Sequence, residues 1–447
     1  MKKYLILGAC GFLAAAAFAD VTVSKVVMTR KSASSRDLEI TYTLAGGPAI
    51  VTFDLLTNGV SIGQANITFL DGDVNRRVEA GDRSFMWLPD RSWPGHSIPS
   101  GAVPVVKAWR DSDPPEYLVS DLMNMSNNFY YTCAEAVPGG VMNPMYRTGS
   151  LLMKRIRAKG VTWTMGSNYG EPGKQSDEVP HPVTLTNDFY IGVFEMTQAQ
   201  YKFLRSPYDK LGFTAEGSMR PACGEQNGLN IRDRGYLNGE PTASAMPNDA
   251  SLFVAYGGCV VGNARLFTGL GYDLPSEAQW EFACRGGTTD GYWNDGTMIE
   301  PDTATDMGLK GRCLQSPEVD GDAAADATSG LLPSEGGTAV CGSYPPNVYE
   351  LYDLHGNVRE VCLDYYPANN SYNSIPYEER RHGVPDAKGG KHLNGSTSSI
   401  IMVGRGGAWR YDAYRARTAC RCTNGNGTWT HGNANGVRLA LTIDNEY

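Results

Sequence analysis

The stretch PPNVYELYDLHGNVREVCLDYY, residues 345–366, places a tight Gly-Asn turn between two carboxylates, Asp353 and Glu360. Side-chain oxygens and free backbone carbonyls can converge on one point around such a turn, which is the oxygen-rich environment that Ca²⁺ prefers. The spacing leaves a second interpretation open, a capped turn that holds no ion. His355, in the same stretch, is interpreted as a structural hydrogen-bonding residue rather than a catalyst.

A second dense stretch lies further along the chain: VGRGGAWRYDAYRARTACRC, residues 403–422, which ends in Cys420 and Cys422. In an extended strand these two side chains would share one face, but a disulfide between them would be strained. We therefore interpret each as a packed thiol or as half of a separate disulfide. Four arginines are expected to anchor loops through hydrogen bonds to carbonyl and carboxylate oxygens: Arg405, Arg415, Arg417 and Arg438.

Helices are expected to be few and short, and the clearest lies in LPSEAQWEFACRGG, residues 274–287. Ser276 and Gln279 form an S-x-x-Q capping box at its start, and Gly286 ends it. A second helix is predicted in MTQAQYKFL, residues 196–204, with Thr197 as its N-cap. Much of the remaining C-terminal part has the composition of loops, which need disulfides, metal or dense hydrogen bonding to be stable.

The N-terminal part, residues 21–109, alternates apolar and polar side chains with the period of a β-strand. The dipeptide Asn58-Gly59 supplies a hairpin turn. Short strands between Gly, Pro and Asp turns predict a β-sandwich over residues 20–112. A connector over 113–150 then leads to a second domain over 151–443.

Residues 1–19 have the features of a secretory signal peptide, with Lys2 and Lys3 before an apolar run and an A-x-A cleavage motif at 17–19. We expect an exported protein, in the periplasm or outside the cell. Lipidation at Cys10 is the less favoured alternative. The apolar run is short for a membrane span and no later stretch is longer, so an integral membrane protein is not expected.

The composition argues against a nucleic-acid partner and bears on cysteine pairing. The whole chain has a formal net charge of −9 at pH 7, and an acidic chain without basic clusters is a poor binder of nucleic acid. Without Cys10, nine of the ten cysteines remain, so in an oxidising compartment some should pair and at least one should not. The catalytic signatures H-E-x-x-H, C-x-x-C and G-x-S-x-G are absent from the sequence.

Several further segments occur together and in one order along the chain. They are GVTWTMGS (160–167), VPHPVTLTNDFYIGVFEMTQAQY (179–201), YWNDG (292–296), GRGGAWR (404–410) and NGVRLA (435–440), in addition to 274–287 and 345–366. With these motifs the chain resembles the formylglycine-generating enzyme, or sulfatase-modifying factor, family. The resemblance covers about residues 150 to 443 and implies a loop-rich C-type-lectin-like fold. The predicted fold class is therefore α+β, with the N-terminal β-sandwich outside the resemblance.

The resemblance also implies a calcium site. Asp353 and Glu360 would give side-chain oxygens, and Gly356 and Val358 would give backbone carbonyls. The family's W-E-W is R-E-V here, so the aromatic packing around the ligands is lost while the ligands remain. Such a calcium ion would stabilise the loops and would not take part in a reaction.

Active members of the family oxidise a sulfatase cysteine to formylglycine with oxygen and a copper(I) ion held by two thiolates, ligands that suit this soft metal. In this sequence Tyr411 stands at the first of those cysteine positions. The second has no counterpart, and Ala413 and Tyr414 lie nearest to it. Cys420 and Cys422 come after the arginines, so we do not expect a copper site.

These observations favour a calcium-stabilised module that binds a protein or glycan, without oxidase activity. Trp409, Trp429 and His431 are the candidate ligand-binding residues, the last two within the polar run TNGNGTWTH, residues 423–431. The alternative is a formylglycine-generating oxidoreductase with relocated catalytic residues, for which Cys420, Cys422 and Tyr411 are the candidates.

Overall fold

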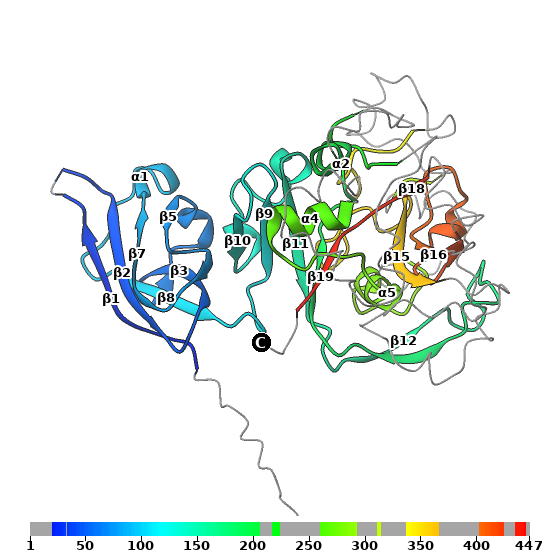
Figure 1. The fold of residues 1–447 in the computed structure, drawn as a ribbon, viewed down its shortest axis with the longest axis horizontal. Coiled ribbons are helices and arrows are strands. Elements are labelled where there is room, and N and C mark those ends of the chain that lie inside the picture. The colour runs from blue at the N-terminus through cyan, green and yellow to red at the C-terminus, as the bar shows by residue number, and fades with distance from the viewer. Residues whose placement is uncertain are drawn as a thin grey trace, which may run out of the picture. The chain divides into compact units, whose positions relative to one another are not determined.

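The computed structural model describes residues 20–32, 34–205, 217–223, 260–292, 311–313, 337–365, 402–423 and 434–443 (Figure 1). The chain divides into two compact units. The first comprises Met1–Ile62 and Phe69–Arg110, and the second comprises Gly63–Thr68 and Asp111–Tyr447. The described elements are mostly strands with few helices, which agrees with the predicted α+β class.

The N-terminal unit contains two antiparallel sheets. One has the order β1 (Thr22–Arg30), β2 (Leu38–Ala45), β7 (Gly81–Trp87) and β5 (Leu70–Gly72). The other has the order β4 (Val60–Ser61), β3 (Ala49–Thr57) and β6 (Arg76–Val78), and β8 (Val103–Trp109) also pairs with β3. A single-turn helix, α1 (Pro89–Ser92), follows β7.

Side chains of the two N-terminal sheets meet in one core. The ring of Phe53 on β3 lies 5.1 Å from that of Phe85 and 6.2 Å from that of Trp87, both on β7. Residues of β2 alternate between buried and more exposed, as the period of two predicted. The predicted turn at Asn58-Gly59 joins β3 to β4 with φ values of 52° and 77°, the positive values that a type I′ turn requires.

The C-terminal unit is built on two further sheets and a two-stranded ribbon. One sheet has the order β10 (Asn128–Tyr131), β9 (Tyr117–Asp121), β11 (Ser150–Ile156), β14 (Phe189–Gly192) and β19 (Ala440–Thr442). The other has the order β17 (Cys422–Thr423), β16 (Met402–Arg405), β15 (Arg359–Tyr365) and β18 (Asn435–Gly436), with β18 parallel to β15. The ribbon pairs β12 (Thr162–Met165) with β13 (His181–Thr184).

The described α-helices of this unit are α2 (Gln198–Arg205), α4 (Val260–Thr268) and α5 (Glu277–Arg285). Short 3₁₀ helices occur at η1 (Gln64–Ile67), η2 (Ala134–Ala136), η3 (Pro144–Arg147) and η7 (Ala413–Ala416). Within the described ranges, no helix has both the length and the apolar character needed to cross a membrane.

Helix α5 confirms the strongest local prediction. The Ser276 hydroxyl accepts a hydrogen bond from the Gln279 amide at 3.1 Å, and the Gln279 side chain accepts one from the Ser276 amide at 2.9 Å. Gly286 ends the helix in the left-handed conformation, with φ of 58°. Every residue of α5 is buried, and the helix packs against β12, β15 and β16 (Figure 1). A helix with charged side chains can be buried on all sides only if each charge has a partner.

The turn at Gly406-Gly407 gives a testable consequence. Gly407 has φ of +72°, and a Cβ there would lie 2.8 Å from the Cα of Ala416. We expect Gly407→Ala to lower the free energy of unfolding of this unit by about 2–4 kcal/mol, since strain in the left-handed region adds to overpacking. Gly140→Ala is the matched control, because it has φ of +76° and nothing within 4 Å of its Cβ. Denaturant unfolding should show the larger loss at Gly407; equal losses would contradict the steric argument.

Candidate functional site

Three buried side chains from separate segments converge in the C-terminal unit. Glu195 follows β14, Cys341 lies in the loop before the 345–366 stretch, and Asp353 lies within that stretch. Their potential ligand atoms all lie within 4.8 Å of one another. Glu195 and Cys341 are 0% exposed and Asp353 is 2% exposed. We refer to these three residues as the acidic cluster.

Neighbouring groups hold the carboxylates of the acidic cluster in place. Glu195 accepts hydrogen bonds from the Val358 amide at 3.1 Å and from the Asn357 side chain at 2.6 Å. Oδ2 of Asp353 accepts one from the Gly342 amide at 2.6 Å. The other oxygen, Oδ1, is buried and has no hydrogen-bond partner within the described parts of the chain. A buried carboxylate oxygen without a partner is costly, so it marks a place where a proton or a cation would be stabilised.

The pKa values of the acidic cluster also indicate that its ionised forms lack sufficient partners. Burial raises the pKa of Glu195 well above its usual value, and the nearby charges of Asp353 and Glu360 raise it further. Burial also raises the pKa of Asp353 to about 7, although the Gly342 amide and Arg438 oppose the change. The pKa of the Cys341 thiol is raised by burial and then by the two carboxylates. Burial and mutual repulsion therefore disfavour the ionised forms of these groups, a cost that a proton or a cation would relieve.

The residues of the predicted calcium site have unequal surroundings. Asp353 fits a cation because its buried Oδ1 has no hydrogen-bond partner among the described residues. Both oxygens of Glu360, in contrast, already accept hydrogen bonds from Arg438, at 2.6 to 2.9 Å, and Oε2 accepts another from Trp280 at 2.6 Å. The two residues expected to offer backbone carbonyls are held through their amides. The Gly356 amide donates to the Gly406 carbonyl at 2.6 Å, and the Val358 amide donates to Glu195. Glu360 thus fits the site poorly, and the four-residue calcium site stays a prediction.

The structure brings Cys420 and Cys422 together. The two residues are 2% and 5% exposed, and the Cys420 thiol donates a hydrogen bond to the Cys422 sulfur. That hydrogen bond, with the charges of Arg359, Arg415 and Arg405, lowers the pKa of Cys422 to about 6 against the effect of burial. The prediction of packed thiols agrees with their burial, but their mutual contact was not predicted.

The expected disulfides are not found among six described cysteines. These carry free thiols: Cys133, Cys284, Cys341, Cys362, Cys420 and Cys422. Five of the six are buried in the core of the C-terminal unit, where hydrogen bonds and packing stabilise the loops instead. The prediction that disulfides do this work is therefore wrong for these six residues.

The remaining candidates from the sequence lie as follows. The guanidinium carbon of Arg359 lies 5.0 Å from the centroid of the Tyr411 ring, and that of Arg415 lies 5.6 Å from the same centroid. Arg359 stands where the resemblance expects tryptophan, so two departures from the family pattern contact each other. Trp409 is 6% exposed, which argues against its predicted role in ligand binding. Trp429 and His431 lie outside the described residues.

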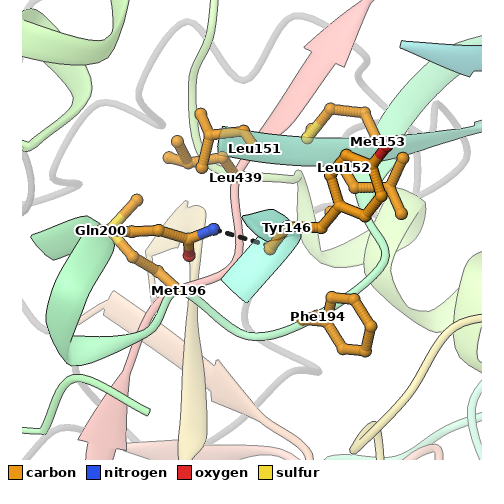
Figure 2. A pocket seen from close by; sticks show the side chains of 9 residues that line it. Tyr146, Leu151, Leu152, Met153, Phe194, Met196, Gln200 and Leu439 are labelled. Atoms are coloured by element: carbon orange, nitrogen blue, oxygen red, sulfur yellow. Dashed lines mark hydrogen bonds between the residues drawn. The ribbon is translucent and has the colours of Figure 1, made fainter. Parts of the chain in front are cut away.

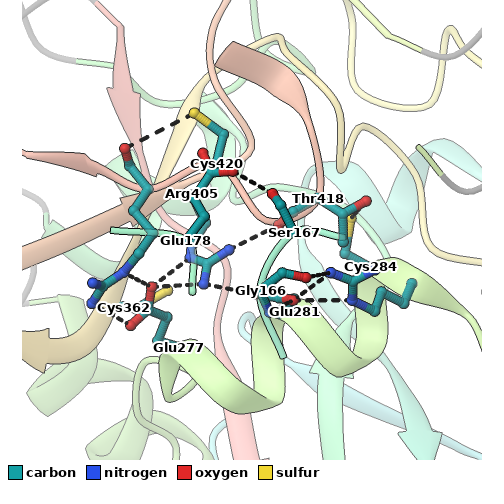
Figure 3. Close-up of polar contacts among 12 residues, drawn as sticks. Gly166, Ser167, Glu178, Glu277, Glu281, Cys284, Cys362, Arg405, Thr418 and Cys420 are labelled. Atoms are coloured by element: carbon teal, nitrogen blue, oxygen red, sulfur yellow. Dashed lines mark hydrogen bonds and ion pairs between the residues drawn. The ribbon is translucent and has the colours of Figure 1, made fainter. Parts of the chain in front are cut away.

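Buried ion pairs confirm for Arg405 and Arg417 the prediction that the arginines anchor loops. Arg405 lies 2.6 Å from Glu277 and 2.8 Å from Glu281, and it donates to the Thr418 carbonyl (Figure 3). Arg417 pairs with Glu171 and Glu178, at 2.6 and 2.8 Å. These pairs join segments that are more than 100 positions apart in the sequence.

One small pocket also lies in the C-terminal unit. It has room for about one water molecule, and Gln200 donates to the Tyr146 carbonyl within it (Figure 2). Its lining is mostly apolar and includes Leu151, Leu152 and Phe194. The pocket is too small for a peptide or a sugar, so we do not regard it as a substrate site.

Sequence reasoning missed Glu195 and Cys341. Glu195 has a signal in the sequence, because it is a single carboxylate within the apolar run IGVFEM, and a charge at such a place is buried with a partner or a cation. Cys341 has no comparable signal. Its neighbours Gly337–Val340 and Gly342–Tyr344 carry no charge or spacing that marks a ligand.

Comparison with known proteins identifies the family of the C-terminal unit. Residues 148–443 match the family described as the sulfatase-modifying factor enzyme 1-like domain. The chain is 25% identical over 303 residues to the formylglycine-generating enzyme of Mus musculus, which covers 61% of this chain and 71% of that enzyme. It is 36% identical over 143 residues to the inactive C-alpha-formylglycine-generating enzyme 2 of Mus musculus, which covers 32% of this chain and only 37% of that protein.

A solved structure, PvdO from Pseudomonas aeruginosa, aligns with a TM-score of 0.41 at 20% identity and covers 65% of this chain and 94% of that chain. The match over residues 148–443 spans more than half of the sequence. The chain therefore belongs to the sulfatase-modifying factor family.

Proposed function

We propose that this protein is an exported, non-oxidase member of the family, whose C-terminal domain binds a protein or glycan and is stabilised by a divalent cation. The observation that carries the proposal is the state of the thiols. Tyr411 stands at the first expected cysteine position, and Cys420 and Cys422 are 2% and 5% exposed. Oxidation of a substrate cysteine requires the thiol site to contact the substrate, and thiols this buried offer no surface for that contact. A mouse relative named as inactive is similar to this chain over 143 residues.

The cation is part of the proposal because of Asp353. One of its oxygens is buried without a hydrogen-bond partner among the described residues, and the family resemblance implies calcium at this turn. A bound cation would tie the turn to its neighbours and supply no chemistry. The N-terminal unit, which we interpret as a β-sandwich, would serve as a spacer or as a second binding module.

The oxidase alternative has one observation in its favour. Cys420 and Cys422 are in hydrogen-bond contact, and the pKa of Cys422 is lowered to about 6. A thiolate is the form that attacks electrophiles and binds soft metals. A relocated thiol pair would therefore be ready for such chemistry if a substrate could reach it.

An oxidation assay separates the two functions. The full chain without its signal peptide would be reconstituted with copper(I) in air and given a peptide with the Cys-x-Pro-x-Arg sulfatase motif. We expect mass spectrometry to find no aldehyde, while an active family oxidase in parallel converts the peptide. Turnover that disappears in a Cys420→Ser, Cys422→Ser variant and persists in Cys133→Ser would overturn the proposal.

The binding half of the proposal has its own measurement. The same protein would be applied to glycan and protein arrays, and each ligand found would be retested with Trp429→Ala. We expect that variant to weaken binding at least tenfold, since an interface tryptophan often contributes about 2 kcal/mol or more to the binding free energy. Unchanged binding would remove residues 423–431 from the proposed surface.

A further inference from the structure

We infer that Glu195, Cys341 and Asp353 together hold the cation, and that the Cys341 sulfur makes the site prefer zinc over the calcium implied by the family resemblance. The inference rests on the cation in the proposed function, and not on the missing oxidase activity or on the binding surface. It assigns two ligands, Glu195 and Cys341, that the predicted calcium site does not contain.

The spacing of the acidic cluster fits a small tetrahedral metal ion. Zinc binds sulfur at about 2.3 Å and carboxylate oxygen at about 2.1 Å, so a tetrahedral ion separates such ligands by about 3.6 Å. Sγ of Cys341 lies 3.7 Å from Oε2 of Glu195. All three potential ligand atoms lie within 4.8 Å of one another, so modest side-chain rotations bring them to a common centre.

A second observation points to a ligand at this place. Oδ1 of Asp353 is buried and, among the described residues, has no hydrogen-bond partner. The other contacts of the cluster resemble those that orient metal ligands, in which outer groups hydrogen-bond the ligating carboxylates. Asn357 and the Val358 amide hold Glu195, and the Gly342 amide holds Asp353. Arg147 donates to the Cys341 carbonyl at 2.8 Å and so fixes the loop that carries the thiol.

The chemistry of these ligands selects the metal. Calcium takes six to eight oxygen ligands and does not favour sulfur, whereas zinc combines thiolate and carboxylate readily. On binding, zinc would displace the Cys341 thiol proton, which passes to water, and a zinc–sulfur bond would form. Glu360 is excluded from this set because Arg438 and Trp280 already occupy its oxygens.

The burial of all three ligands indicates a structural role. Exposure of the ligand residues is 0% to 2%, which leaves no open face for a substrate. A fourth ligand would be a water molecule or a backbone carbonyl. The ion would link the segment after β14 to the 345–366 stretch, which also supplies β15.

The test is a metal-binding experiment on the full chain that carries Cys420→Ser and Cys422→Ser, so that the other thiol pair cannot bind metal. The protein would be freed of metal with a chelator and dialysed against zinc or calcium, and its metal content measured by mass spectrometry. We expect about one zinc ion per chain, a higher melting temperature with zinc, and a weaker effect of calcium. Cobalt(II) in place of zinc should give a thiolate-to-cobalt charge-transfer band in the near ultraviolet.

Two variants and one control complete the test. Cys341→Ser should abolish the cobalt band and weaken zinc binding by at least tenfold, roughly the smallest loss expected even for an outer-shell partner. Asp353→Asn should weaken zinc binding without removing the band. Cys133→Ser should behave like the parent, because that thiol lies outside the acidic cluster.

The inference is overturned if calcium binds and zinc does not, or if the band persists in Cys341→Ser. It is also overturned if neither metal binds or changes the melting temperature, which would mean that protons neutralise the carboxylates. The oxidation assay measures aldehyde formation independently of zinc content. Failure of the zinc-site inference can therefore be distinguished from failure of the proposal that the protein is not an oxidase.

Discussion

Replacing Arg438 by methionine is expected to lower the free energy of unfolding by about 3–5 kcal/mol. Arg438 is 0% exposed and is paired with Glu360 at 2.6 Å. It also donates to the carbonyls of Gly192 and Tyr352, at 2.8 and 2.7 Å. Its removal would leave a buried carboxylate without its cation and buried carbonyls without donors, and both are costly. Denaturant unfolding of the full chain measures the loss.

Arg157→Met is the matched control for this prediction. Its side chain is 54% exposed and pairs with Glu116 and Asp113 on the surface, where an ion pair contributes about 0–1 kcal/mol. If both variants lost the same amount, burial of the Arg438 pair would not be the cause. A second variant, Arg438→Met with Glu360→Gln, should recover part of the loss because the uncompensated charge is gone.

The second large effect concerns acid stability through Glu277. Burial opposes ionisation of this carboxyl, but Arg405 and Arg421 outweigh it and lower the pKa to about 2, from an ordinary value of 4.5. A carboxyl with a depressed pKa stabilises the fold above its unfolded pKa. That stability, about 3 kcal/mol, is lost as the pH falls from about 5 through the folded pKa.

Glu277→Gln tests this by removing the titration. At pH 7 the variant should be less stable than the parent by about 3 kcal/mol, and the difference should shrink towards zero as the pH approaches 2. Unfolding curves at a series of pH values give the difference directly. Glu350→Gln is the control, since that carboxylate is 40% exposed beside Lys154 and should change stability by less than about 1 kcal/mol. A difference in unfolding free energy between Glu277→Gln and the parent that does not vary with pH would contradict the ion-pair explanation.

Both predictions concern buried charges that come from distant segments. Arg438 and Glu360 are 78 positions apart, and Arg405 and Glu281 are 124 positions apart. Such pairs join distant segments of the loop-rich C-terminal unit, for which the sequence suggested disulfides, metal or dense hydrogen bonding. This explains how a unit with few helices can bury polar side chains at 0% to 2% exposure.

The sequence by itself determined what depends on near neighbours. The capping box of Ser276 and Gln279 and the stop at Gly286 set the ends of α5, because these groups lie within one turn of each other. Asn58-Gly59 set a turn because both residues adopt positive φ at little cost. The ordered motifs from residue 160 to 440 identified the family, since each motif is local even though the set is long.

Only the tertiary structure decided which charges meet. Asp353 and Glu360 have the spacing of a shared calcium site, yet Arg438 and Trp280 occupy Glu360 while Glu195 and Cys341 approach Asp353. Cys341 and Glu195 are 146 positions apart, so no local pattern could place them together. The reason is physical: a buried charge takes whichever partner the closed fold brings within reach, and the free energy of that pairing depends on burial, which no short stretch of sequence specifies.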